Sequence, residues 1–309
     1  MQRLTLAGGI PEAFKGSIVA LGNFDGFHLG HQAVVGRAVQ RAFHERRPAI
    51  VATFDPHPVH FFKPGLPPFR LTTLDQRERL FAHAGADAML VFEFGPELAS
   101  MDAEAFVADV LKQRIGAAGV ITGDDFSFGK GRAGDVALLA RLGTEHGIAA
   151  EAVPQVLLNG ERISSGRIRE ALVAGDIGTA THMLSRDYAI AGAVQRGDAR
   201  GRELGYPTAN LSLGDYQRPK YGIYAVRVAM DDGSERPGVA SLGVRPTFDP
   251  PEELLEAHLF DFDGDLYGRV IEVALHAYIR EEKKFGDVAD LIAHMREDET
   301  AARKLLAID

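Results

Sequence analysis

The stretch that decides the fold covers residues 18–31 and reads Ile-Val-Ala-Leu-Gly-Asn-Phe-Asp-Gly-Phe-His-Leu-Gly-His. Its first four residues form an apolar run typical of a buried strand, and the glycines behind it predict a turn. An amphipathic helix is then expected at residues 31–43. We expect its inner face to consist of Ala33, Val34, Val35, Ala38, Val39, Ala42 and Phe43.

Two histidines lie three residues apart where this helix is expected to begin. The spacing puts His28 and His31 on one side of the helix, beside its first amide groups and the positive end of its dipole. Two imidazole donors in that place suit a triphosphate under attack at its α-phosphorus, because they can stabilise charge on the phosphoryl oxygens.

On a helix such a pair is more often a surface feature or half of a metal site. Metal ligands on a helix usually lie four residues apart, however, and no acidic third ligand follows at a regular spacing. The preceding strand, the Gly-Asn-Phe-Asp-Gly turn and the His-x-Gly-His order together favour a catalytic role over a surface feature. With them, the segment resembles the His-x-Gly-His nucleotidyltransferases, which transfer a nucleotidyl group from a nucleoside triphosphate and release pyrophosphate.

Composition is typical of a soluble globular protein of two domains. The chain has 309 residues, of which 46% are hydrophobic and 25% charged. It lacks cysteine, which excludes disulfides and thiolate chemistry. Its net charge of −9, with no long basic run, argues against a nucleic-acid binder. No apolar stretch suits a membrane helix or a signal peptide, so we expect a cytoplasmic location.

Strand-like and helical segments alternate through the first half of the chain. Short apolar runs predict strands at residues 18–21, 49–54, 88–92, 120–122 and 149–153. Helical patterns lie at residues 31–43, 74–84, 102–114 and 135–146, followed by two more at 164–174 and 177–184. This alternation predicts a parallel sheet with right-handed crossovers. Ligands of such sheets bind at the carboxyl ends of the strands, where the histidine pair is expected.

The second half of the chain has a different sequence pattern. Between residues 188 and 279, strand-like segments are separated by glycine-rich turns, and Asp-Asp-Gly at 231–233 predicts a hairpin turn. Spaced strands with little helix suggest a small barrel. Residues 287–306 are amphipathic. The expected apolar face of that last helix is Val288, Leu291, Ile292, Met295 and Leu305.

A turn rich in proline and aromatic residues is expected where the second strand ends. Residues 53–58 read Thr-Phe-Asp-Pro-His-Pro, and Phe61 and Phe62 follow. The prolines hold the turn extended, so that its aromatic rings could stack on a flat ligand. From residue types alone, a surface loop whose phenylalanines cover the core is the preferred interpretation.

A glycine-rich loop follows the fourth strand at residues 123–132, which read Gly-Asp-Asp-Phe-Ser-Phe-Gly-Lys-Gly-Arg. It is not a P-loop, because position 124 would have to be glycine and Lys130 precedes glycine rather than serine or threonine. Two cations and two aromatic side chains remain on a loop at the ligand edge of the sheet.

A capped helix start is predicted at residues 162–169, which read Arg-Ile-Ser-Ser-Gly-Arg-Ile-Arg. Ser164 or Ser165 can cap the helix, and a capped start beside arginines can bind an anion. Taken alone, an ordinary capped helix with solvated arginines explains this segment equally well.

In this order the segments resemble the N-terminal half of the bacterial bifunctional riboflavin kinase/FMN adenylyltransferase family over residues 15–185. The resemblance implies that His28 and His31 stabilise the transition state of adenylyl transfer, assisted by Arg169. The other implied ATP ligands are Gly22, Asn23, Phe24, Asp25, Gly30, Ser164 and Ser165. The implied flavin site is Phe54, Pro56, His57, Pro58, Phe62, Asp125 and Phe128. Gly166 replaces a threonine of the family and Asp125 a frequent asparagine, which alters those two contacts.

The strongest single motif covers residues 197–210 and reads Gly-Asp-Ala-Arg-Gly-Arg-Glu-Leu-Gly-Tyr-Pro-Thr-Ala-Asn. Its glycines let the backbone approach a phosphate. Thr208 and Asn210 point to one side of an extended segment and offer the hard oxygen ligands that Mg²⁺ accepts. Taken alone, a glycine-rich corner of a barrel explains the motif equally well.

Together with residues 238–248 and 256–268, this motif resembles the riboflavin kinase module with its Pro-Thr-Ala-Asn signature. The resemblance implies that Thr208 and Asn210 bind Mg²⁺ and the ATP phosphates. It also implies that Glu256 is the general base for the ribityl 5′-hydroxyl, a residue that would otherwise be a solvated strand position. The further nucleotide ligands implied here are Gly197, Gly201, Arg202, Gly205 and Pro207.

The chain therefore resembles a flavin-nucleotide enzyme of two domains. We expect a Rossmann-like parallel-sheet nucleotidyltransferase domain at residues 1–185 and a six-stranded β-barrel kinase domain with a terminal helix at residues 186–309. The resemblance implies that riboflavin and ATP give FMN, and that FMN and a second ATP give FAD and pyrophosphate. Mg²⁺ is the implied cofactor, and no nucleic-acid, membrane or protein partner is expected.

Three alternative functions explain the sequence less well. The intact residues 207–210 and Glu256 argue against an adenylyltransferase whose barrel has lost its activity. Arg169 and the histidine pair argue against a flavin sensor that binds without turnover. A cytidylyl- or pantetheine-type transferase would not explain the second domain. Ser241, where the family frequently has asparagine, and residues 184–188 depart from the family pattern.

Overall fold

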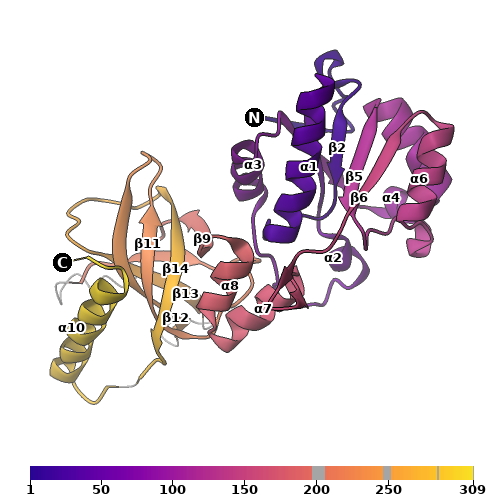
Figure 1. The fold of residues 1–309 in the computed structure, drawn as a ribbon. Helices are drawn as coiled ribbons and strands as arrows, with labels where there is room; N and C mark the ends of the chain where they lie inside the picture. Colours follow the sequence, from indigo (N-terminus) through magenta and orange to yellow (C-terminus); the bar gives the residue numbers. More distant parts are fainter. Residues whose placement is uncertain (197–205, 246–251, 284, 309) are drawn as a thin grey trace. The chain divides into compact units, whose positions relative to one another are not determined.

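The computed structural model describes residues 1–196, 206–245, 252–283 and 285–308, and the chain folds into two compact units (Figure 1). Unit 1 contains Met1–Pro67 and Thr73–Ser164, and unit 2 contains Pro68–Thr72 and Ser165–Asp309. Because the division comes before two helices expected in the first domain, these helices pack with the barrel. The functional boundary at residue 185 stays a prediction.

A parallel sheet of six strands, in the order β1–β4–β3–β2–β5–β6, is the centre of unit 1. Its strands are β1 Gln2–Thr5, β2 Ile18–Leu21, β3 Ala49–Asp55, β4 Ala88–Glu93, β5 Gly119–Gly123 and β6 Ala149–Val153. All five strands predicted from the sequence are confirmed. Edge strand β1 was not predicted, because only Leu4 of its four residues is buried and no apolar pattern marks it.

Helices cover both faces of this sheet. They are α1 Leu29–Glu45, α2 Pro58–Phe62, α3 Leu74–His83, α4 Pro96–Ser100, α5 Ala103–Ala105, the π-helix Phe106–Ile115 and α6 Val136–Glu145. Buried residues of α1 and α3 form one core with one face of the strands, and those of the π-helix and α6 form a second core with the other. The helix predicted at residues 102–114 is present, divided between α5 and the π-helix.

The buried side of α1 is narrower than predicted. Val34, Val35, Ala38 and Ala42 are buried, whereas the side chain of Phe43 is 80% exposed. Position 43 follows Ala42 by one residue, which turns it about 100° around the helix and out of the apolar stripe. The prediction that Phe43 belongs to the inner face is wrong.

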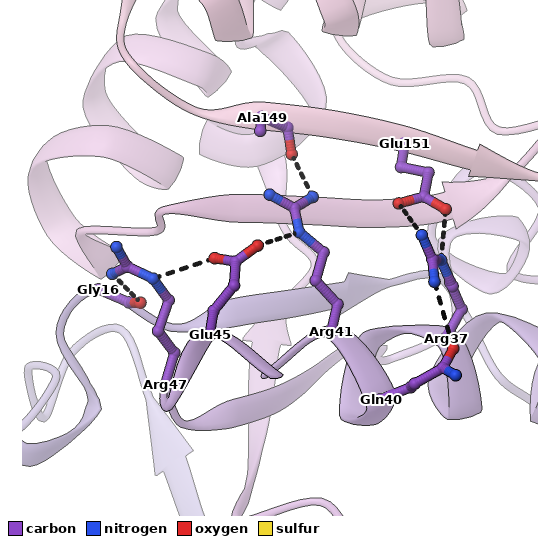
Figure 2. Close-up of polar contacts among 8 residues, drawn as sticks. All are labelled: Gly16, Arg37, Gln40, Arg41, Glu45, Arg47, Ala149 and Glu151. Carbon is purple, nitrogen blue, oxygen red and sulfur yellow. Dashed lines mark hydrogen bonds and ion pairs between the residues drawn. The ribbon is translucent and has the colours of Figure 1, made fainter. Parts of the chain in front are cut away.

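Arginines of α1 tie this helix to β6 (Figure 2). Arg37 pairs with Glu151, and Arg41 donates a hydrogen bond to the carbonyl of Ala149 at 3.1 Å. Arg41 also hydrogen-bonds Glu45 one turn later, which lowers the pKa of that carboxyl. Exposed ion pairs contribute little to stability, because water screens them, so these contacts orient α1 more than they stabilise the unit.

A nearly closed antiparallel barrel of six strands, in the order β10–β13–β12–β11–β14–β9, forms most of unit 2. Its strands are β9 Tyr188–Ala193, β10 Ala209–Ser212, β11 Gly222–Ala229, β12 Glu235–Arg245, β13 Glu252–Leu259 and β14 Val270–Arg280. A bridge between Gln195 and Asn210 joins the end of the β9 segment to β10. Leu211, Tyr224 and Leu255 are fully buried inside the barrel.

The described part of unit 2 also contains the helices α7 Ser165–Ala174, α8 Ile177–Leu184 and α10 Val288–Leu305. Ala302 and Leu306 pack beside Ala225 of the barrel. Val288 and Leu305 are 57% and 45% exposed, so their place in the predicted apolar face is wrong. Val288 lies in the first turn of α10, well before its buried residues Asp298 and Ala302, and Leu305 is turned about 100° around the helix axis from the buried Leu306. No helix in the described ranges is long and apolar enough to cross a membrane.

Two phenylalanines of unit 1 test the observed packing. Phe81 of α3 is completely buried, whereas Phe43 is 80% exposed. We expect Phe81→Ala to lower the free energy of unfolding by about 3–5 kcal/mol, since it leaves a cavity. The control Phe43→Ala should change it by less than about 0.5 kcal/mol. Urea denaturation followed by circular dichroism measures both, and equal losses would contradict the assigned packing.

Candidate functional site

The turn between β2 and α1 lies at the point of the sheet where the strand order reverses, since β3 and β5 flank β2 on opposite sides. Phe24 and Phe27 adopt positive φ values of 50° and 42° there, and both are buried. Their rings contact Phe81 with centroid separations of 5.8 and 5.1 Å. Left-handed backbone at two aromatic residues is unfavourable, so the turn is held by the burial of their rings.

The histidine pair is assembled at the first turn of α1. His28 is the N-cap residue, and its Nδ1 accepts a hydrogen bond from the backbone N–H of His31 at 3.3 Å. The two imidazole rings stack with centroids 3.6 Å apart. Because Nδ1 is the acceptor, the proton of a neutral His28 lies on Nε2, which is therefore a hydrogen-bond donor.

Gly30 leaves the space that the His28 ring occupies. A Cβ atom at position 30 would lie 3.1 Å from Cε1 and 3.2 Å from Nδ1 of that ring. His28 and Asp25 are 5% and 3% exposed, so the predicted ATP residues of the turn form a packed group. Gly22 contributes in a similar way, because its missing side chain gives room to the Phe24 ring.

The predicted flavin residues of the aromatic turn come together at the ends of β3 and β4. Phe54 is buried and stacks on Phe92 with centroids 5.1 Å apart. Phe62 is 62% exposed and contacts Phe94, which follows β4 and which the sequence analysis missed. His57 caps α2 by accepting a hydrogen bond from the N–H of Val59. An exposed aromatic ring beside buried ones offers a surface on which a flat ring can stack.

Asp125 and Phe128 of the glycine-rich loop have different surroundings. Asp125 forms an ion pair with Arg162. An asparagine, which the family frequently has at this position, could not form that ion pair, because its amide is uncharged. Phe128 is 7% exposed and packs against Phe106 and Phe126 with centroids 5.7 and 5.8 Å apart. Their contacts with a flavin stay predictions.

The serine–arginine motif straddles the two compact units. Ser164 ends unit 1, whereas Ser165 and Arg169 belong to unit 2. Within unit 2, Arg169 donates through Nε to the carbonyl of Phe69 at 2.7 Å, and its guanidinium lies over the Phe69 ring. The share of these residues in the ATP site stays a prediction.

In unit 2 the predicted kinase residues lie on neighbouring strands of the barrel sheet. Asn210 of β10 is directly opposite Glu256 of β13, which is directly opposite Ser241 of β12. Directly opposed residues point to the same face, so the three side chains are neighbours. Asn210 is 7% exposed. The hydroxyl of Ser241 donates to Glu282 at 3.1 Å, a carboxylate that the sequence analysis missed.

The segment before Asn210 is fixed by a histidine that the sequence analysis also missed. Nδ1 of His258 lies 2.9 Å from the carbonyl oxygen of Pro207, so this nitrogen carries the proton and donates it. The ring of His258 also contacts that of Tyr206, with centroids 5.0 Å apart. His258 therefore fixes the backbone beside Thr208. Gly197, Gly201, Arg202 and Gly205 lie outside the described residues.

Two family models match the chain. The model described as FAD synthetase matches residues 10–167, and the model described as riboflavin kinase matches residues 184–306. The chain is 40% identical to the bifunctional riboflavin kinase/FMN adenylyltransferase of Pseudomonas fluorescens, over 95% of this chain and 94% of the relative. It is 37% identical to the protein of the same name from Escherichia coli K12, over the same shares.

The fold is also similar to that of a solved structure. A protein from Streptococcus pneumoniae described as a macrolide-efflux protein has a TM-score of 0.87 and 30% sequence identity to this chain. The match covers 98% of this chain and 99% of that protein.

The role of His28 as the N-cap of α1 can be tested independently of the chemistry of its ring. His28→Ala removes the acceptor of the His31 N–H, so we expect a loss of about 0.5–2 kcal/mol in the free energy of unfolding. His28→Asn keeps a side-chain acceptor at the N-cap and should retain most of the stability. Denaturant unfolding of the two variants measures this difference, and equal losses would show that the cap is unimportant.

Proposed function

The chain belongs to the bifunctional riboflavin kinase/FMN adenylyltransferase family, and we propose that each of its two activities is performed by a separate group of residues. The enzyme phosphorylates riboflavin to FMN and adenylylates FMN to FAD. His28 and His31 act in adenylyl transfer, and Thr208, Asn210 and Glu256 act in the kinase reaction. The observation that supports this assignment is that each motif is assembled inside its own compact unit. A cytoplasmic location and the lack of a protein partner stay predictions.

In adenylyl transfer, a phosphate oxygen of FMN attacks the α-phosphorus of ATP. The bond to that phosphorus forms as the bond between it and the bridging oxygen of pyrophosphate breaks. Negative charge grows on the phosphoryl oxygens, and donors already in place lower the barrier. His28 presents its Nε2–H because its Nδ1 is bound to the His31 amide. The N-terminus of α1 favours the same charge.

In the kinase reaction, the ribityl 5′-hydroxyl attacks the γ-phosphorus of ATP as the bond between that phosphorus and the oxygen bridging it to ADP breaks. ADP leaves, and the proton of the hydroxyl passes to the carboxylate of Glu256. Asn210 is directly opposite Glu256, so its amide lies beside that carboxylate on the neighbouring strand. His258 holds the carbonyl of Pro207 and so positions the backbone that leads to Thr208. Positioning of this kind supplies most of the catalysis in phosphoryl transfer.

Mg²⁺ fits the donor set of the kinase site. The described residues contain no cluster of three or more His, Cys, Asp or Glu residues able to hold a metal by themselves. Thr208 and Asn210 instead offer a hydroxyl and an amide oxygen, which suit an ion that keeps water and phosphate ligands. When bound, Mg²⁺ neutralises charge on the phosphates of ATP.

Two variants should separate the activities. We expect His28→Asn to abolish FAD formation from FMN and ATP while riboflavin is still phosphorylated, because the N-cap remains and the imidazole does not. We expect Glu256→Gln to abolish FMN formation from riboflavin while added FMN is still converted to FAD. Chromatographic separation of riboflavin, FMN and FAD measures both steps.

Failure of this pattern would identify which assignment is wrong. If His28→Asn still makes FAD at the parental rate, the histidine pair is not the adenylyl-transfer site. If Glu256→Gln still phosphorylates riboflavin at that rate, another group accepts the hydroxyl proton. If the parental protein makes neither FMN nor FAD, the whole proposal fails.

The proposed metal ligand can be tested through the Mg²⁺ dependence of the kinase. We expect Asn210→Ala to raise the Mg²⁺ concentration for half-maximal FMN formation by about 10- to 100-fold, the range found when groups that support a metal site are removed. The Mg²⁺ dependence of FAD formation from added FMN is the internal control. An unchanged Mg²⁺ requirement of the kinase would exclude Asn210 as a ligand.

A further inference from the structure

Unit 1 contains a buried arginine that the proposed mechanism does not use. Arg77 lies on α3 and is 3% exposed. It is joined to Asn23 in the turn that follows β2 and to Thr53 near the end of the neighbouring strand β3, after which the proposed flavin turn begins. Burial of a guanidinium is costly unless acceptors surround it, so its contacts indicate what it does in this place.

The first set of contacts fixes the nucleotide turn. Nη1 of Arg77 donates to the carbonyl oxygen of Asn23 at 3.3 Å, and the hydroxyl of Thr53 donates to the same oxygen at 2.7 Å. Two donors therefore hold one carbonyl. Because the peptide is planar and trans, the N–H of Phe24 in the same peptide points away from the guanidinium. Arg77 thus sets the direction of a backbone donor in the proposed ATP turn.

The second set of contacts fixes the flavin turn. Nη1 also donates to the hydroxyl of Thr53 at 2.8 Å and lies 3.5 Å from the carbonyl oxygen of Phe54. Nη2 is 3.8 Å from the carboxylate of Asp55, the residue directly before Pro56. One planar guanidinium therefore contacts three consecutive residues of the strand end from which the aromatic turn leaves. A lysine ammonium cannot reproduce this, because it is a single point charge without a fork.

We propose that Arg77 is a positioning residue for adenylyl transfer, which holds the nucleotide turn at Asn23 and the flavin turn at Thr53–Asp55 at a fixed separation. This inference rests on the proposed function of both turns. An error of about 1 Å between reacting groups can cost about 100-fold in rate. Loss of Arg77 therefore lowers kcat for FAD formation more than it weakens the binding of either substrate.

The decisive experiment compares Arg77→Met, Arg77→Lys and Thr53→Val in the full-length enzyme. We expect Arg77→Met to lower kcat for FMN adenylylation by about 100-fold. The KM values for ATP and FMN should change by less than about threefold, as for an interaction that acts in the transition state. Arg77→Lys restores the charge without the fork and should recover only part of the loss. Thr53→Val removes the shared hydroxyl and should also lower kcat.

The same chain provides controls for a merely structural role. Arg79→Met changes an exposed arginine two residues further along α3 and should leave both activities unchanged. Riboflavin phosphorylation by unit 2 should be unaffected in every variant. If circular dichroism shows that Arg77→Met prevents folding of unit 1, the kcat of the near-isosteric Thr53→Val variant tests the inference by itself.

Three results would overturn the inference. They are an unchanged kcat in Arg77→Met, a rise in KM without a fall in kcat, and full recovery of kcat in Arg77→Lys. When Thr53→Val has to decide, an unchanged kcat in that variant overturns it as well. Failure of the proposed function is distinguished by His28→Asn: if that variant keeps FAD formation, the histidine turn itself was wrongly assigned. If His28→Asn is inactive and Arg77→Met is not, only the positioning role fails.

Discussion

The proposed adenylyl-transfer site depends on the packing of Phe24 and Phe27 against Phe81. Left-handed backbone at a bulky residue costs about 1–3 kcal/mol. Burial of a phenylalanine contributes about 1.5–3 kcal/mol, and an aromatic pair about 0.5–1.5 kcal/mol more, so packing offsets the strain. The result is a short connection from β2 to α1 that makes His28 the N-cap and stacks it on His31.

In unit 2 the proposed site residues are brought together by strand register, as the strained turn brings the two histidines together in unit 1. Asn210 and Glu256 are far apart in the sequence, yet antiparallel pairing of β10 with β13 makes them direct neighbours. A shift of one residue would turn Glu256 to the other face of the sheet, among the apolar residues of the barrel interior. The fully buried Leu211 and Leu255, which are also opposed, hold the register that places the carboxylate outside.

Sequence patterns predicted the central elements well because those elements are strongly apolar. Edge strand β1 was not predicted because an edge strand buries few side chains. Phe43 was wrongly placed on the inner face because residue type alone does not show where the apolar stripe of a helix ends. Arg77 gave no signal, since an arginine on an amphipathic helix usually faces water. His258 was missed because its partner is a backbone carbonyl, which no sequence motif reveals.

The sequence by itself determined the alternation of five strands with helices in the first half, the change from a parallel sheet to a barrel, and the residue types of both motifs. These follow from local periodicity and from short spacings along the chain. Only the tertiary structure decided that Phe81 packs against both aromatic rings of the histidine turn, which strand faces Glu256, and that Arg77 joins two turns. Those features depend on contacts between residues distant in sequence, and such contacts exist only once the chain has packed.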